Sequence, residues 1–256
     1  VSFICTWSIL FGYVSVISFE AVALPTVLTY LIPNLSHGYL WTILDWDVHI
    51  TWVAIGLVGA LLVTLINVLG IKTAAKLQVL VTSLILISGL ILFFGAAEFG
   101  QSRNLHPFIT NHMSGFLSVL VMVPFMFVGF DVIPQAAQEI DIPFNKIGQT
   151  IIISIVMAIT WYVLIIIAIS LGIGQQALNN SELPAADAAK ILFNSNAMGN
   201  LIVLAGIGGL LTSWNAFLIG GSRAIYAMSE AGQINFPEEE IISRGRIEAG
   251  GILYYN

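Results

Sequence analysis

Six long apolar stretches, separated by short polar segments, dominate the chain. They cover about residues 2–32, 52–69, 77–97, 114–139, 148–173 and 200–228. Of the 256 residues, 58% are hydrophobic and 9% are charged, whereas a soluble domain carries about 25% charged residues. About 20 apolar residues in a helix cross a bilayer, so the pattern predicts an all-α polytopic membrane protein with six transmembrane helices.

The chain divides into a transmembrane region, residues 1–234, and a polar tail, residues 235–256, to which no role is assigned. Val1 runs directly into apolar sequence, without the basic segment and cleavage site of a signal peptide. We therefore expect that an upstream part of the protein precedes this chain. Between the apolar stretches we expect a polar, aromatic loop over 33–51 and a short surface helix over 184–193.

The distribution of basic residues predicts the orientation. Six of the eight lie at the 70–76 turn, in the 140–147 linker, or at the end of the last span and in the tail; these are Lys72, Lys76, Lys146, Arg223, Arg244 and Arg246. The alternate segments hold Arg103 and Lys190. Because basic residues concentrate in cytoplasmic loops, both ends of the chain are predicted to be cytoplasmic in a multi-pass protein of the cell membrane.

The fourth apolar stretch contains residues that interrupt a helix. Pro134 has no backbone N–H, so we expect the carbonyl of Phe130 to lose its helical partner, and Gly129 permits unusual backbone angles. We expect a break over about residues 129–133, with Asp131 inside it. Secondary transporters build substrate sites from discontinuous helices of this kind, because freed backbone groups need partners in the membrane.

Two carboxylates, Asp131 and Glu20, fall within predicted spans, where each costs about 2.5–3.5 kcal/mol on insertion scales. Asp131 could bind a substrate amine or take up a proton, or it could cap a half-helix that starts near Pro134. Glu20 could relay a proton or bind a cation, or it could be a hydrogen-bonded packing residue between helices.

The sixth stretch places Gly209, Thr212 and Ser213 close together. Carbonyl and hydroxyl oxygens suit a small cation, so these residues are a candidate sodium site. Alternatively, the two hydroxyls bond back to their own helix, as such residues often do in membranes. Phe217 is the next residue after Ser213 on the same helix face, and we add it to the candidate substrate-binding residues.

The sequence disfavours two other classes of function. An intramembrane hydrolase needs a nucleophile and a base within spans, yet none of the four histidines lies in a predicted span. The basic residues are too few and too dispersed to bind nucleic acid. We therefore expect a protein that is not an enzyme, and no cofactor other than Na⁺ or H⁺ as a coupling ion.

Several segments resemble the amino acid–polyamine–organocation (APC) permeases. Residues 124–131, followed by 136–139 and Pro143, are similar to the broken sixth helix of that family. Three further segments resemble parts of the family, in the same order as in the family. Residues 7–25 resemble the third helix, residues 67–76 resemble the turn between the fourth and fifth helices, and residues 220–228 with Gly232 resemble the end of the eighth helix.

This resemblance implies a partial LeuT-type inverted-repeat fold, in which the chain supplies family helices three to eight and upstream and downstream helices complete the transporter. It implies that substrate lies against Gly129, Phe130 and Asp131. It also implies that Gly209, Thr212 and Ser213 match a sodium site of LeuT-type transporters. Some proton-coupled relatives carry a lysine midway along the fifth helix, but this chain has Ile85 about there and no lysine in 77–97.

Together, these observations favour a secondary active transporter that moves amino acids or related amines across the cytoplasmic membrane by alternating access. Its partners would be the small-molecule substrate and the lipid bilayer. One alternative is a polyamine or ethanolamine permease of the same fold, which two intramembrane carboxylates favour. A second alternative, from another class, is a membrane channel or a non-transporting membrane scaffold.

Overall fold

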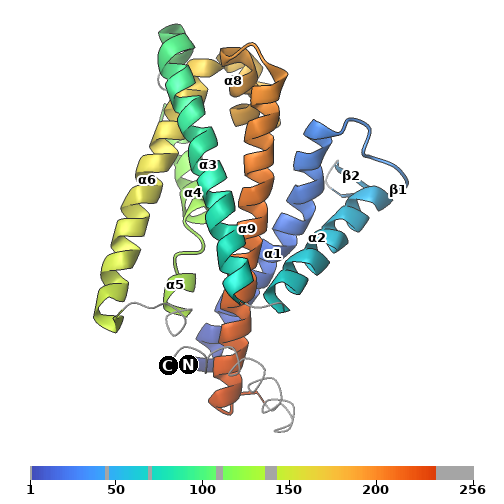
Figure 1. The fold of residues 1–256 in the computed structure, drawn as a ribbon, viewed down its shortest axis with the longest axis vertical. Helices are drawn as coiled ribbons and strands as arrows, with labels where there is room; N and C mark the ends of the chain where they lie inside the picture. Colours follow the sequence, from blue (N-terminus) through green and yellow to red (C-terminus); the bar gives the residue numbers. More distant parts are fainter. Residues whose placement is uncertain (1, 44–45, 69–70, 108–111, 136–142, 235–256) are drawn as a thin grey trace.

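The computed structural model describes residues 2–43, 46–68, 71–107, 112–135 and 143–234 (Figure 1). Its α-helices are α1 (Ser2–Leu31), α2 (Ile50–Val68), α3 (Ile71–Phe99), α4 (His112–Met126), α5 (Val132–Gln135), α6 (Ile147–Gly172), α7 (Gln175–Asn179), α8 (Pro184–Leu192) and α9 (Asn196–Glu230). Two short 3₁₀ helices, η1 (Ser102–Leu105) and η2 (Phe144–Lys146), and two strands, β1 (Tyr39–Ile43) and β2 (Trp46–His49), complete the described elements.

The helices confirm the prediction of an all-α polytopic membrane protein. Among the described residues, five helices are long and apolar enough to span a membrane, namely α1, α2, α3, α6 and α9. The remaining predicted span is the broken one, and it appears as the shorter apolar helix α4 followed by α5. The predicted polar tail, 235–256, and residues 140–142 of the predicted linker lie outside the described residues.

Helix α9 is the centre of the arrangement, with α1 and α2 on one side and α3 and α8 on the other (Figure 1). Glycine and alanine are buried along its length, and such small residues let helix backbones approach closely in a membrane. One apolar cluster joins α3, α6 and α8; a second, of Tyr13, Val132 and Phe217, joins α1, α5 and α9. A third, of Leu24, Val63 and Trp214, joins α1, α2 and α9.

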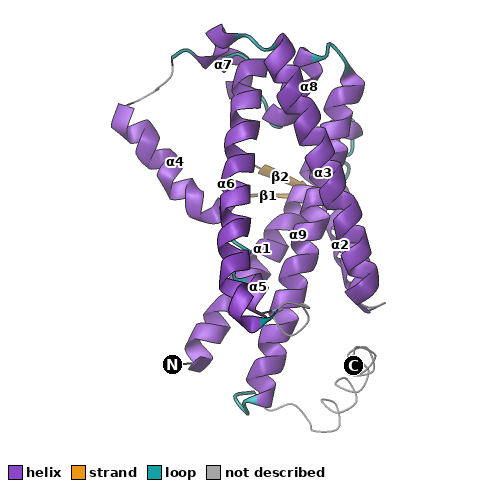
Figure 2. Ribbon diagram, turned by 60° about the vertical axis from the view of Figure 1, so that its left-hand side comes forward, coloured by secondary structure: helices purple, strands orange, loops and turns teal. Residues whose placement is uncertain are grey.

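The loop prediction for residues 33–51 was wrong over most of its second half, because β1 and β2 form an antiparallel hairpin (Figure 2). Aromatic and β-branched residues are frequent in these strands, and such side chains favour strands. Thr42 Oγ1 donates to Asp47 Oδ1 at 2.6 Å across the pair. The backbone N–H of Ile50 donates to the carbonyl of Gly38 at 2.7 Å, which ties the hairpin to the start of α2.

Two further predictions need correction. Helix α3 begins at Ile71, so Lys72 and Lys76 lie in that helix and not in a turn. Helix α8 forms where a short surface helix was predicted, but Ala186, Ala188, Ala189 and Leu192 are buried against α6 and α3. It is therefore an amphipathic helix that covers the ends of the spans.

Replacing Gly56 with alanine is expected to destabilise the protein by about 1–3 kcal/mol, as overpacking typically does. A Cβ at Gly56 would lie 2.8 Å from the carbonyl oxygen of Ala21, so the backbones of α1 and α2 would have to separate. Gly206 is the matched control, because no described atom of a neighbouring element lies within 4 Å of its Cβ position. The midpoint of thermal unfolding in detergent should fall for Gly56→Ala and not for Gly206→Ala; equal midpoints would contradict the close contact.

Candidate transport site in a broken helix

The predicted break is present, but it begins two residues earlier than expected. Helix α4 ends at Met126 and α5 begins at Val132, so the irregular backbone covers residues 127–131 and not 129–133. Pro134 lies in the first turn of α5, where a backbone N–H has no intrahelical partner and proline is tolerated. The carbonyl of Phe130 keeps a partner, since the N–H of Ile133 donates to it at 3.3 Å.

Gly129 is the residue that requires special backbone geometry within the break. Its φ is +114°, in a region that L-amino acids with a side chain rarely adopt. Tight turns provide hydrogen-bond partners for part of the irregular backbone. For example, the N–H of Val132 donates to the carbonyl of Gly129 at 3.1 Å. The hydroxyl of Tyr162 in α6 donates to the carbonyl of Met126 at 2.9 Å, so α6 supports the end of α4.

Asp131 holds the break together through both of its oxygens. Oδ1 accepts from the backbone N–H of Gly129 at 3.1 Å, and Oδ2 accepts from the hydroxyl of Tyr13 at 2.7 Å. Asp131 directly precedes α5, at the position of an N-cap residue. Its two hydrogen bonds, however, go to Gly129 in the break and to Tyr13 in α1. A carboxylate has about four lone-pair sites, so the exposed Asp131 can still accept a hydrogen bond from a ligand.

Phe217 brings α9 against the same backbone. Its ring centroid lies 5.5 Å from that of Tyr13, and its Cζ would be 3.3 Å from a Cβ placed on Gly129. Phe130 lies in the break, and its ring stacks on that of Phe127 at 6.0 Å. The structure therefore brings Gly129, Asp131 and Phe217 into one place, with Phe130 adjacent in the chain.

Tyr13 belongs to this site, although the sequence did not single it out. Its side chain is buried, with 2% of its surface exposed. The signal was available in principle, because a tyrosine in the middle of an apolar span needs a hydrogen-bond partner for its hydroxyl. Asp131 is that partner.

Glu20 and Ser213, which the sequence treated as separate candidates, lie together between α1 and α9. The Ser213 side chain is a polar neighbour of the Glu20 carboxyl group. Glu20 is 3% exposed, and its Oε2 has no hydrogen-bond partner within the described part of the chain. At least one oxygen of this carboxyl group is therefore buried without a donor among the described residues.

Two of the candidate sodium ligands, the hydroxyls of Thr212 and Ser213, lie in different surroundings. Thr212 Oγ1 donates to the carbonyl of Gly209 at 3.0 Å, as expected for a hydroxyl that bonds back to its own helix. The Ser213 side chain instead lies near the Glu20 carboxyl group. The side chain of Ile85 in α3 lies 3.5 Å from the Cβ position of Gly209, so α3 presents an apolar group here. A sodium site at these residues stays a prediction.

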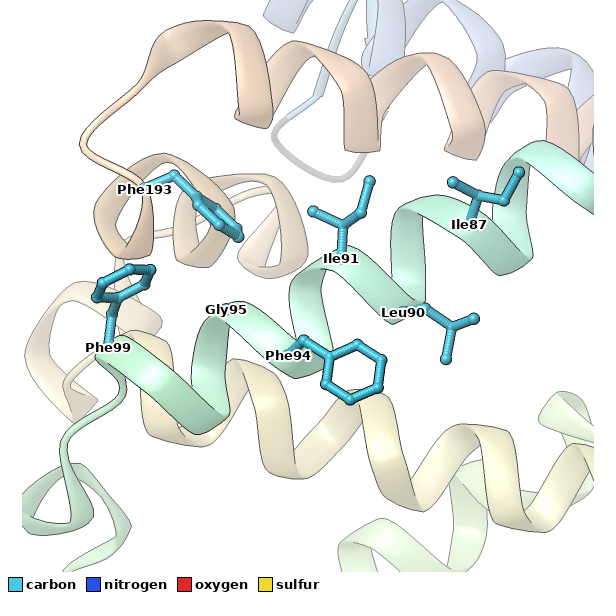
Figure 3. Close-up of a pocket in the computed structure, with 7 residues that line it drawn as sticks. All are labelled: Ile87, Leu90, Ile91, Phe94, Gly95, Phe99 and Phe193. Carbon is cyan, nitrogen blue, oxygen red and sulfur yellow. The ribbon is translucent and has the colours of Figure 1, made fainter.

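A concave region on α3 is unsuited to a zwitterion. It is a hollow of about 470 Å³ between α3 and Phe193, lined by aliphatic and aromatic side chains and Gly95 (Figure 3). The charged ends of an amino acid need hydrogen-bond partners when they leave water, and none of these lining side chains provides one. The broken helix, with its carboxylate and irregular backbone, is the stronger candidate site.

Comparisons with known proteins show the family to which the chain belongs. The chain is 24% identical over 181 residues to the branched-chain amino acid permease BcaP of Bacillus subtilis, covering 67% of this chain and 37% of BcaP. It is 28% identical over 168 residues to the aromatic amino acid transport protein AroP of Corynebacterium glutamicum, covering 60% of this chain and 35% of AroP.

The chain thus spans less than half the length of these relatives. The sequence pattern of the amino acid permease family matches residues 1–246, which is nearly the whole chain. This chain therefore belongs to the amino acid permease family.

Proposed function

We propose that this chain is the substrate-binding part of a secondary transporter that moves amino acids by alternating access. The observation that carries the proposal is the broken span, where Asp131 and the irregular backbone at Gly129 lie against Phe217. The irregular backbone, which the hydrogen bonds of Asp131 hold in position, supplies polar partners for the charged ends of an amino acid. Discontinuous helices at membrane depth serve this purpose in secondary transporters.

Substrates with apolar side chains fit this site best. Phe130 supplies partly exposed aromatic surface beside the polar break, and the buried ring of Phe217 packs against Gly129. The names of the relatives BcaP and AroP, which refer to branched-chain and aromatic amino acids, support the same class of substrate. In our proposal, the substrate side chain packs on the ring of Phe130 while its ammonium and carboxylate groups contact the break.

The arrangement of the two carboxylates, Asp131 and Glu20, supports the polyamine alternative less well than amino acid transport. Asp131 bonds to Tyr13, and Glu20 lies seven residues further along α1, a rise of about 10 Å. Glu20 is buried against Ser213, whereas Asp131 is exposed at the break. A diamine at the break would therefore meet one carboxylate and not two.

Counterflow is the experiment that tests the proposal. The complete reading frame is reconstituted in liposomes that are preloaded with unlabelled leucine, phenylalanine or putrescine, and entry of the labelled compound is followed. Saturable counterflow with leucine or phenylalanine is expected, because a carrier exchanges substrate through one site. Counterflow with putrescine alone would support the polyamine alternative, and flux that neither saturates nor shows counterflow would support a channel.

We also propose that both ends of the chain face the cytoplasm of the cell. In a Cys5→Ala background, Asn180→Cys should react with a membrane-impermeant maleimide added to intact cells, and Asn145→Cys should react only after permeabilisation. Both asparagines are exposed, and they lie at opposite ends of α6, which spans the membrane between them. Labelling of Asn145→Cys in intact cells would reverse the orientation.

A further inference from the structure

We propose that Tyr162 is a positioning residue that fixes the broken span from the side of α6 and sets how well the site distinguishes aromatic from aliphatic amino acids. This inference rests on the proposed transport function and adds a determinant of specificity to it. Tyr162 lies within α6 and outside the break, so it acts through the residues that it contacts.

The hydrogen bond of Tyr162 gives a carbonyl at the start of the break a partner. Carbonyls on either side of it accept from backbone N–H groups; these are the carbonyls of Pro124, Phe125, Gly129 and Phe130. The carbonyl of Met126, the last residue of α4, accepts from the Tyr162 hydroxyl at 2.9 Å. A carbonyl that a break frees within the membrane needs such a partner, since lipid offers none. Tyr162 therefore fixes the point at which α4 ends.

The ring of Tyr162 makes the second contact. It meets the ring of Phe127 edge-on, with centroids 6.0 Å apart and an interplanar angle of 75°. Phe127 in turn stacks on Phe130, with centroids 6.0 Å apart and an interplanar angle of 28°. Aromatic pairs prefer edge-on and offset-stacked arrangements, so each ring restricts the orientation of the next. These three rings, which we call the aromatic row, lead from α6 to the ring on which the proposed substrate side chain packs.

The aromatic row gives Tyr162 a selective influence on the substrate. Phe130 is partly exposed, so its ring has surface left for a ligand after stacking on Phe127. A flat aromatic side chain depends on the orientation of the ring that it meets, whereas a branched aliphatic side chain packs on many orientations. Loss of the aromatic row should therefore weaken binding of phenylalanine more than binding of leucine.

The two contacts of Tyr162 have different expected consequences. The hydroxyl acts on the backbone of the break, which every amino acid substrate uses for its charged ends, so its loss should affect all substrates alike. The ring acts on the orientation of Phe130, so its loss should affect substrates according to their side chains. A residue that merely stabilised the fold would change the amount of active protein and not the preference between two substrates.

The test measures KM and the maximal rate of counterflow for leucine and for phenylalanine in proteoliposomes of the complete reading frame. Tyr162→Phe removes the hydroxyl and keeps the ring, so KM should rise about 3–10-fold and by a similar factor for both substrates. Tyr162→Leu removes the ring as well, and KM for phenylalanine should rise at least about threefold more than KM for leucine. Phe127→Leu should reproduce this change in the ratio with the Tyr162 hydroxyl in place.

Tyr226→Phe is the matched control, because it removes the hydroxyl of an exposed tyrosine near the end of α9, and it should leave both KM values unchanged. A fold defect in any variant would lower the maximal rate but not change the ratio of the two KM values. A ratio that stays unchanged in either Tyr162→Leu or Phe127→Leu would overturn the role of the aromatic row and leave amino acid transport standing. Absence of counterflow in the unaltered protein would overturn the proposed transport function itself, and the inference with it.

Discussion

Gly129→Ala is expected to lower amino acid counterflow by about tenfold or more. Gly129 has φ of +114°, and a residue with a side chain held in such a conformation costs about 1–3 kcal/mol. The new methyl group would also lie 3.3 Å from Cζ of Phe217. Since about 1.4 kcal/mol corresponds to a factor of ten, strain at the break alone accounts for the expected loss. Initial rates, divided by the amount of monodisperse protein in the liposomes, give the measurement.

Two companion variants separate the causes of this loss. Gly148→Ala, in the first turn of α6, is the matched control, because no described atom lies within 4 Å of its Cβ position and it should transport normally. Phe217→Leu in combination with Gly129→Ala removes the contact but not the backbone strain. If the double variant recovers transport, contact with Phe217 dominates; if it does not, backbone strain dominates. Normal transport by Gly129→Ala would show that the break does not contribute to the transport site.

The sequence predicts the spans and the existence of the break for clear physical reasons. Long apolar runs have few alternatives to a membrane helix, and the combination of Gly129, Asp131 and Pro134 in one run disfavours a continuous helix. The exact position of the break was harder to predict. Proline interrupts a helix from within but also fits its first turn, and only the structure shows that Pro134 lies in the first turn of α5.

The pairing of side chains between helices could not be predicted from the sequence. In α1, apolar residues surround the helix on every side, so no periodic pattern indicates which face meets α9. Tyr13 and Glu20 lie seven residues apart and share one face, but the partners Asp131 and Ser213 are fixed only when the helices pack. The β-hairpin was missed because a short strand with aromatic residues resembles an interfacial loop in composition.

Asp131→Ala is expected to reduce neutral amino acid uptake by about ten- to a hundredfold, whereas Asp131→Asn should retain uptake to within about tenfold. Alanine leaves the buried Tyr13 hydroxyl without its acceptor, and an unsatisfied buried group costs about 1–3 kcal/mol. The same change removes the acceptor for the Gly129 N–H, so two bonds that fix the break are lost together. Asparagine can accept from Gly129 through its oxygen and donate to the Tyr13 oxygen through its amide.

Tyr13→Phe tests the same contact from the other side, and the pair of variants distinguishes two roles for Asp131. If Asp131 mainly positions the break, Tyr13→Phe and Asp131→Asn should each raise KM or lower kcat severalfold. The double variant should then lose less transport than the product of the two single effects, because both substitutions act on one hydrogen bond. If the carboxylate instead binds the substrate ammonium directly, Asp131→Asn should fail as severely as Asp131→Ala while Tyr13→Phe transports well. Since the hydrogen bonds of Asp131 join Gly129 to α1, we expect the first pattern.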